Sequence, residues 1–171
     1  MKTPSIITGE QLTTALHMLG VDFIMGEEYP NESLHKQPAR LIAALGQSPD
    51  ARLRLSLIPL FLEHPEFAAY VPSVAIKVTP AARLILKCYY TAAVWLQQQH
   101  RNQLNALIGN KPSLPDHFSR DIGYEISNDP EENLKSLAQR HQLLSGAQVN
   151  WLGTYQHAAQ VLLKGLELQK A

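Results

Sequence analysis

Apolar residues follow one another almost without interruption over residues 84–96, LILKCYYTAAVWL, where Lys87 and Thr91 are the polar exceptions. These two residues are four apart, so on an α-helix they share one stripe with Arg83. A helix that is apolar in every other direction is surrounded by other helices. The segment therefore predicts a helix buried on all sides but one.

Helix start and stop signals surround this segment on both sides. Near the N-terminus, Thr8 and Gln11 have the spacing of a capping box, and Gly20 supplies a stop, so we expect a helix between them. The short apolar stretch Val21–Met25 that follows has no evident partner strand. We interpret it as an ordered connection.

Prolines indicate the next helices. A second helix is expected over Ser33–Leu45, or only from Pro38 onward, because proline suits a first turn better than a helix interior; Gly46 should end it. The sequence Ser48-Pro49-Asp50 then offers a cap and an acidic first turn for the segment ARLRLSLIPLFLEH. Pro59 is expected to kink that helix or to divide it.

A long helix should follow a short amphipathic stretch. The stretch EFAAYV is closed by Pro72 in this interpretation, and Thr79-Pro80 repeats the combination of cap and first-turn proline. From there a single helix can run to Ile108, where Gly109-Asn110 stops it. This helix, Thr79–Ile108, includes the apolar segment and is expected at the centre of the fold.

The remainder of the chain predicts one long loop and two further helices. Residues 111–127 form the longest irregular segment, and loops of that length are typically binding elements or mobile. Asp129-Pro130 begins a helix that ends near Gly146, and a last helix should cover Gln148 to about Gln169. Its inward stripe is expected to comprise Leu152, Tyr155, Ala159, Leu162 and Leu166.

Alternating strand patterns are nearly absent, so the fold class is predicted to be all-α. The 171 residues suit one domain, residues 1–171, built as a bundle of about six helices around the long helix. Cys88 is the only cysteine and lies in the apolar segment, which indicates an inert core residue in an intracellular protein.

Charge and hydropathy exclude some classes of function. The chain has 15 Lys and Arg and 15 Asp and Glu, so no overall field attracts it to nucleic acid. Its longest apolar run is shorter than the ~20 residues of a membrane span, and its start lacks a signal peptide. We expect a cytoplasmic protein without membrane association, for which nucleic acid is a low-ranking partner.

One helical hairpin resembles a known repeat. The segment LIAALGQSPDARLRLSLIPLFLEHPE is similar to a HEAT-type repeat, with a Ser-Pro-Asp turn between two helices, although no second copy follows. This segment and LKCYYTAAVWLQ also resemble small uncharacterised bacterial helical proteins, some of them associated with nucleotidyltransferase-type toxin–antitoxin pairs. The nucleotidyltransferase signature itself, Gly-Ser followed by paired aspartates, is missing. The resemblance implies an antitoxin-like or regulatory role in a bacterial complex.

Common catalytic motifs are absent. The chain has no GxGxxG, P-loop, HExxH or GxSxG motif and no Cys/His spacing typical of zinc, so we predict no metal and no cofactor. Its histidines are scattered, and for each of them a surface or helix-capping role is expected: His17, His35, His64, His100, His117, His141 and His157.

Two constellations are candidate sites. Asn150, Thr154 and His157 form a polar stripe on the last helix, bordered by Trp151 and Tyr155, which would serve as a pocket or a hydrogen-bonding contact, or simply as a solvated face. The second candidate combines acid, base and cation in the long loop, where the alternative is a solvated loop with local salt bridges: Asp116, His117, Arg120 and Asp121.

A third, basic group is conceivable where two helices pack together. Arg83 and Lys87 can join one of Arg52 and Arg54, but not both, because the latter two point about 200° apart on a helix. The alternative is that all four side chains lie along helix edges.

These observations favour binding over catalysis. We predict a non-enzymatic helical protein-interaction module that binds a protein partner or forms a homo-oligomer, with Tyr70, Trp95 or Trp151 partly exposed at the contact. The alternative is a small all-α enzyme or ligand-binding protein that uses one of the two candidate sites.

Overall fold

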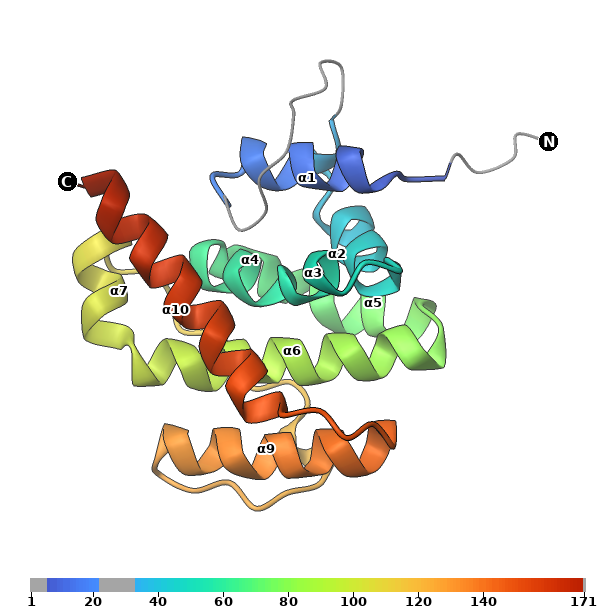
Figure 1. Ribbon diagram of the computed structural model, residues 1–171, viewed down its shortest axis with the longest axis vertical. Helices are drawn as coiled ribbons and strands as arrows, with labels where there is room; N and C mark the ends of the chain where they lie inside the picture. Colours follow the sequence, from blue (N-terminus) through green and yellow to red (C-terminus); the bar gives the residue numbers. More distant parts are fainter. Residues whose placement is uncertain (1–5, 22–32, 171) are drawn as a thin grey trace.

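Helix α6 (Pro80–Gln99) packs against helices on several sides. In the computed structural model, which describes residues 6–21 and 33–170, it runs between α4 (Leu57–Glu63) and α9 (Pro130–Ser145), and α10 (Trp151–Lys170) crosses it diagonally (Figure 1). The described residues contain helices and loops but no strand. The prediction of a single all-α domain is thus confirmed, and one hydrophobic core connects its helices.

The first helix has the predicted boundaries. In α1 (Gly9–Met18) the Gln11 amide donates to the Thr8 hydroxyl at 3.2 Å, and the Thr8 amide donates to the Gln11 side chain at 2.8 Å. This reciprocal pair satisfies two amides that the first turn leaves without partners. Gly20 follows in the left-handed conformation with φ 80°. The expected connection Val21–Met25 lies outside the described residues after Val21.

The helices over residues 38–63 are divided differently from the expectation. Helix α2 (Pro38–Gln47) continues through Gly46, and a 3₁₀ turn at Leu34–Lys36 precedes it. Asp50, rather than Ser48, caps α3 (Ala51–Leu55) by accepting from the Arg52 amide at 2.9 Å.

The break after α3 falls at Ser56 and not at Pro59. Pro59 is the third residue of α4, where its missing N–H would have no partner in the helix in any case. The prediction that Pro72 ends the preceding stretch is also wrong. Pro72 is the second residue of α5 (Val71–Lys77), and the 3₁₀ helix before it, Pro65–Tyr70, ends without it.

The long helix begins as predicted and ends earlier. The Thr79 hydroxyl accepts from the Ala82 amide at 3.3 Å, but His100 separates α6 from α7 (Arg101–Ile108). The change of direction allows α7 to pack against α10, where Lys170 Nζ donates to the Ala106 carbonyl at 2.6 Å. Such breaks make the helices shorter and more numerous than the expected six.

The open stripe of α6 is narrower than predicted. All residues from Cys88 to Gln97 are buried, including Thr91, whose hydroxyl donates to the Lys87 carbonyl at 2.7 Å and so needs no water. Burial raises the pKa of Cys88 to about 12, in agreement with an inert core thiol. Solvent reaches α6 in its N-terminal half, where Arg83 and Lys87 are half-buried, and again at its C-terminal end, where Gln98 and Gln99 are exposed.

Helices α9 and α10 complete the fold. Helix α9 begins where predicted, with Asp129 as its cap, and Gly146 ends it with φ 69°. Helix α10 starts at Trp151, not Gln148, and buries four of its five predicted inward residues, whereas Leu152 is half-buried. No helix in the described ranges has the length and apolar content that a membrane crossing requires.

Candidate functional site

Two of the three side chains in the polar stripe on α10 form hydrogen bonds within the first turn of that helix. The Asn150 side chain accepts from the Gly153 amide at 3.0 Å, and the Thr154 hydroxyl donates to the Asn150 carbonyl at 2.9 Å. His157 is exposed one turn further along. Asn150 therefore serves as a helix cap and Thr154 bonds back to the Asn150 carbonyl, which leaves His157 as the exposed member one turn on.

The two aromatic residues beside that stripe belong to a buried cluster. Trp151 and Tyr155 pack with Tyr89 of α6 and His141 of α9, four residues that we call the aromatic cluster. The His141 ring stacks on Trp151 with centroids 3.6 Å apart, and its Nδ1 lies 2.5 Å from the Tyr155 hydroxyl. The cluster joins three helices through ring contacts and one buried hydrogen bond.

The surroundings of His141 overturn one expectation. A surface or capping role is wrong for this histidine, because it is 1% exposed, and burial lowers its pKa to about 4. Trp95 is likewise buried rather than exposed, with Nε1 donating to the Tyr124 hydroxyl at 2.8 Å, whereas Trp151 is half-buried. The sequence signal for the cluster was available, since His141 and Tyr155 lie on the inward faces of their helices.

The acid, base and cation of the long loop do not converge. Asp116 accepts from the amides of Phe118 and Ser119, at 3.3 and 3.1 Å, and so caps the short helix α8 (Ser119–Ile122). Arg120 is exposed. The two remaining members, His117 and Asp121, line a surface groove together with residues far away in the sequence.

The loop is held in place by two side chains of α6. The Gln97 amide group donates to the Pro112 carbonyl at 2.9 Å and accepts from the Leu114 amide at 2.7 Å. The Tyr90 hydroxyl donates to the Pro115 carbonyl at 2.5 Å. These contacts tie the loop to α6 just before His117 and Phe118, which line the groove.

We call this hollow the α5–α8 groove. Its volume of about 480 Å³ is in the range of sites that hold a small molecule or several side chains of a peptide. Helix α5, the N-terminal half of α6 and the loop with α8 contribute its lining: Pro72, Ala75, Ile76, Arg83, Lys87, His117, Phe118 and Asp121.

The two cations of the groove differ in how they are held. Arg83 donates from Nε to the Ala75 carbonyl at 2.7 Å and from Nη2 to the Ile76 carbonyl at 3.1 Å, so it caps the C-terminus of α5. Lys87 Nζ lies 3.8 Å from the Asp121 carboxylate and 5.5 Å from the centre of the Phe118 ring. Lys87 is therefore the more loosely held cation.

The other two members of the expected basic group lie elsewhere. Arg54 donates to the Ser48 carbonyl at 2.9 Å, and Arg52 is 3.7 Å from Asp50 with a side chain 77% exposed. Neither lines the groove. The four basic residues therefore do not form one group, and of them only Arg83 and Lys87 lie at the groove.

His117 connects the groove to the core. Its ring stacks on Tyr90 with centroids 5.1 Å apart, and its Nε2 lies 3.1 Å from the Ala68 carbonyl, to which it donates. The ring is half-buried. It therefore acts as a wall of the groove that is anchored on its inner side.

The apolar wall of the groove is exposed. Ile76 is 76% exposed. Tyr70, which precedes α5 and is not among the residues that line the groove, is 42% exposed; its expected partial exposure is thus confirmed, and its place at a partner contact stays a prediction. Sequence reasoning missed Ile76 because it treated Pro72 as a terminator. The signal was present: residues 71, 74, 75 and 78 form the inward face of α5, and Ile76 falls outside it.

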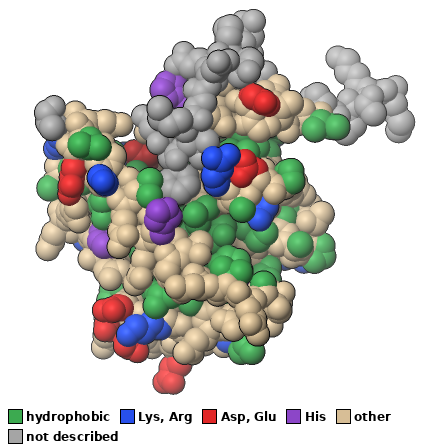
Figure 2. Space-filling model, viewed as in Figure 1, with side chains coloured by type: hydrophobic (Ala, Val, Ile, Leu, Met, Phe, Trp, Pro, Cys, Tyr) green, Lys and Arg blue, Asp and Glu red, His purple; other side chains and the backbone are tan. Residues whose placement is uncertain are grey.

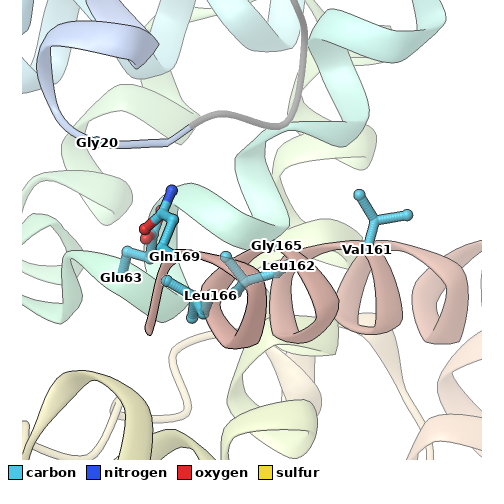
Figure 3. Close-up of a pocket in the computed structure, with 7 residues that line it drawn as sticks. All are labelled: Gly20, Glu63, Val161, Leu162, Gly165, Leu166 and Gln169. Atoms are coloured by element: carbon cyan, nitrogen blue, oxygen red, sulfur yellow. The ribbon is translucent and has the colours of Figure 1, made fainter. Parts of the chain in front are cut away.

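Two other hollows offer less chemistry. The one in Figure 3 lies between the end of α1, the end of α4 and the last turns of α10, and its volume of about 30 Å³ holds a water molecule or two. Another, of about 500 Å³, lies between residues 6–12 and the α2–α3 turn. Asp50 is the one charged residue in its lining, and its carboxylate already caps α3.

The described surface shows no other concentration of reactive groups. In residues 6–21 and 33–170, no three His, Cys, Asp or Glu side chains lie close enough to hold a metal ion. Acidic and basic side chains are interspersed on the face seen in Figure 2, without a broad area of one sign. The α5–α8 groove is therefore the best-supported candidate site.

Comparison with models of known protein families, with curated proteins and with solved structures gave no match to this chain.

Proposed function

We propose that this chain is a non-enzymatic protein-interaction module and that the α5–α8 groove is its docking surface. The observation that supports this most is Ile76, a large apolar side chain 76% exposed at the rim of a groove of about 480 Å³. Exposed apolar residues are common singly, but a groove with apolar walls and charged groups at its edge is typical of a protein contact.

The chemistry of the groove favours binding over catalysis. Arg83 donates to backbone carbonyls, and the His117 ring donates to the Ala68 carbonyl. Neither side chain is therefore placed to transfer a proton to a substrate. Asp121, with a side chain 63% exposed, lies beside Lys87 as an ion pair. Such groups can orient a charged partner without reacting with it.

The kind of complex is also part of the proposal. The HEAT-like hairpin over residues 41–66, the central role of α6, and the antitoxin-like or regulatory role in a bacterial cytoplasmic complex all stay predictions. A protein partner and a second copy of the chain are both candidates for the docking surface. The equal numbers of acidic and basic residues in the chain, 15 of each, favour protein over nucleic acid.

A paired substitution tests the proposal. Ile76→Asp and Leu143→Asp each place a carboxylate at a highly exposed apolar position, 76% and 72% exposed, on α5 and on α9. Tagged protein is purified from cells that naturally produce it, and co-purifying chains are identified and quantified. We expect a stoichiometric partner, or the dimer, to be lost from Ile76→Asp and retained by Leu143→Asp.

Size-exclusion chromatography and circular dichroism check that both variants are folded. Retention of every partner and of the oligomeric state by Ile76→Asp would contradict the proposal. Loss with Leu143→Asp alone would place the contact at the turn between α9 and α10, where Leu143, Leu144 and Val149 are exposed.

A further inference from the structure

We infer that the α5–α8 groove binds a segment of a partner protein in which a carboxylate lies close to a large apolar side chain, and that Asp121 acts as a built-in competitor for this carboxylate. The inference rests on the proposed function and names the chemistry of the partner.

The apolar part of the groove requires an apolar partner group. Ile76 and Pro72 of α5 form one wall, and Phe118 contributes to another. A side chain of leucine or phenylalanine size that enters between them removes apolar surface from water on both partners, and this is the main source of affinity in small interfaces.

The charged part of the groove favours an anion. Two cations, Arg83 and Lys87, line it, against a single carboxylate, that of Asp121. Arg83 is fixed by the carbonyls at the end of α5, so its charge contributes to the field while its position does not change. An incoming carboxylate is therefore drawn to the side of the groove where Lys87 lies.

Lys87 is the group that a partner carboxylate would contact. Its ammonium has three donors, and Asp121 approaches it only to 3.8 Å, close to the limit for an ion pair. The Lys87 side chain is 25% exposed, whereas that of Asp121 is 63% exposed. Asp121 thus screens Lys87 from one side and can rotate into solvent when a better-placed carboxylate arrives.

The apolar wall distinguishes this site from one for nucleic acid. Phosphate groups alone would use Arg83 and Lys87 but would leave Ile76 and Pro72 uncovered. A peptide segment uses both parts. We therefore expect binding to depend on Ile76 and on Lys87 together.

The probe is a phage-displayed library of random twelve-residue peptides, selected on the full chain and counter-selected on Ile76→Asp. Enriched sequences should combine an Asp or Glu with a Leu, Phe or similar residue within about one helical turn. A synthetic peptide of the most enriched sequence is then labelled with fluorescein, and its affinity is measured by fluorescence anisotropy.

The groove variants should change the affinity in opposite directions. Ile76→Asp should weaken binding roughly tenfold or more, because it removes apolar burial and adds a repelling charge. Lys87→Gln should weaken it roughly three- to tenfold, and Asp121→Asn should strengthen it roughly two- to fivefold. Lys135→Gln and Glu132→Gln, which alter an exposed ion pair on α9, should leave it unchanged.

A double-mutant cycle identifies the ionic contact itself. A peptide in which the acidic residue is replaced by its amide should lose the same factor as Lys87→Gln and should no longer respond to that substitution. Equal affinity of wild type and Lys87→Gln, enrichment of peptides without an acidic residue, or weaker binding by Asp121→Asn would overturn the inference. Tighter binding of a labelled single-stranded RNA that depends on Lys87 and not on Ile76 would overturn it as well.

Failure of this inference can be told apart from failure of the proposed function. If binding of a natural partner requires Ile76 but does not change with substitutions of Lys87 and Asp121, the groove is still the docking surface, and the inference of an acidic partner segment is wrong. If no partner depends on Ile76, the docking surface is wrong too.

Discussion

The aromatic cluster and the α5–α8 groove each contain a histidine stacked on an aromatic ring, yet they serve different purposes. His141 is 1% exposed between Trp151 and Tyr155, and its hydrogen bond is to another buried side chain. His117 stacks on Tyr90 on one side and faces the groove on the other. A histidine stacked on an aromatic ring thus joins helices in the aromatic cluster and forms part of the wall in the α5–α8 groove.

Burial explains the difference between the two regions. In the aromatic cluster the buried rings pack on one another and His141 and Tyr155 hydrogen-bond within the fold, so changes there should act on stability. In the groove, Ile76 and the Lys87–Asp121 pair are still accessible to solvent, so changes there should act on binding.

The largest expected effect is on the aromatic cluster. His141→Ala removes a buried ring and leaves the Tyr155 hydroxyl without its partner, which should lower the free energy of unfolding by about 3–4 kcal/mol. His117→Ala loses one hydrogen bond at the edge of the groove and should cost about 1 kcal/mol. Urea denaturation followed by circular dichroism measures both, and equal losses would refute the separation.

The free energy of unfolding should depend on pH because of the titration of His141. Its pKa is about 4 in the folded protein and about 6.5 in the unfolded chain, so the unfolded chain binds the proton first as the pH falls. The contribution is complete above about pH 6.5 and is lost as the pH falls through 4, by up to about 3 kcal/mol in total.

Burial lowers the pKa of His100 as well, which adds a loss in the same direction. Urea titrations at several pH values between 7 and 4 measure the slope, and His141→Phe should make it shallower. An unchanged slope in that variant would show that His141 does not titrate as described.

An intermediate effect is expected for Gln97, which holds the loop that carries one wall of the groove. Gln97→Ala leaves the buried Leu114 amide without its acceptor and should cost about 2 kcal/mol. Amide hydrogen exchange should then increase over residues 111–118 more than elsewhere. Exchange that stays unchanged in this loop would mean that other contacts hold it.

The smallest effects on stability are expected in the groove. Ile76→Asp and Lys87→Gln alter side chains that reach solvent, so the free energy of unfolding should change by no more than about 0.5 kcal/mol in either. Differential scanning calorimetry of the purified variants checks this. A large loss in stability would mean that the groove is part of the structural core and not a free surface.

Helix starts were predictable because their signals are local. Thr8 with Gln11, Thr79 with Pro80, and Asp129 with Pro130 each cap a helix where the sequence indicates. The breaks at Ser56 and His100 were not predictable, because neither residue is a proline or glycine and the direction of the chain there depends on packing. The division expected at Pro59 falls at Ser56 instead, whereas Pro72 was misinterpreted as a terminator because a first turn tolerates proline.

The candidate site was predictable only in fragments. His117 and Asp121 were singled out in the loop, and Arg83 and Lys87 on α6, but no local pattern indicates that they meet at α5. The role of Asn150 as a helix cap follows from its position before Trp151, once the start of α10 is known. Assembly of the groove depends on tertiary contacts that a single sequence does not display.

The most direct test of the central claim, that the groove and not the aromatic cluster is the binding region, is site-specific photo-crosslinking. A photoreactive benzoylphenylalanine is placed at position 76, at the exposed control position 143, or at position 157 on the same helix as the cluster, in cells that naturally produce the protein. We expect a discrete crosslinked species from position 76 and none from positions 143 and 157. A discrete species from position 157 or 143, with none from position 76, would contradict the account.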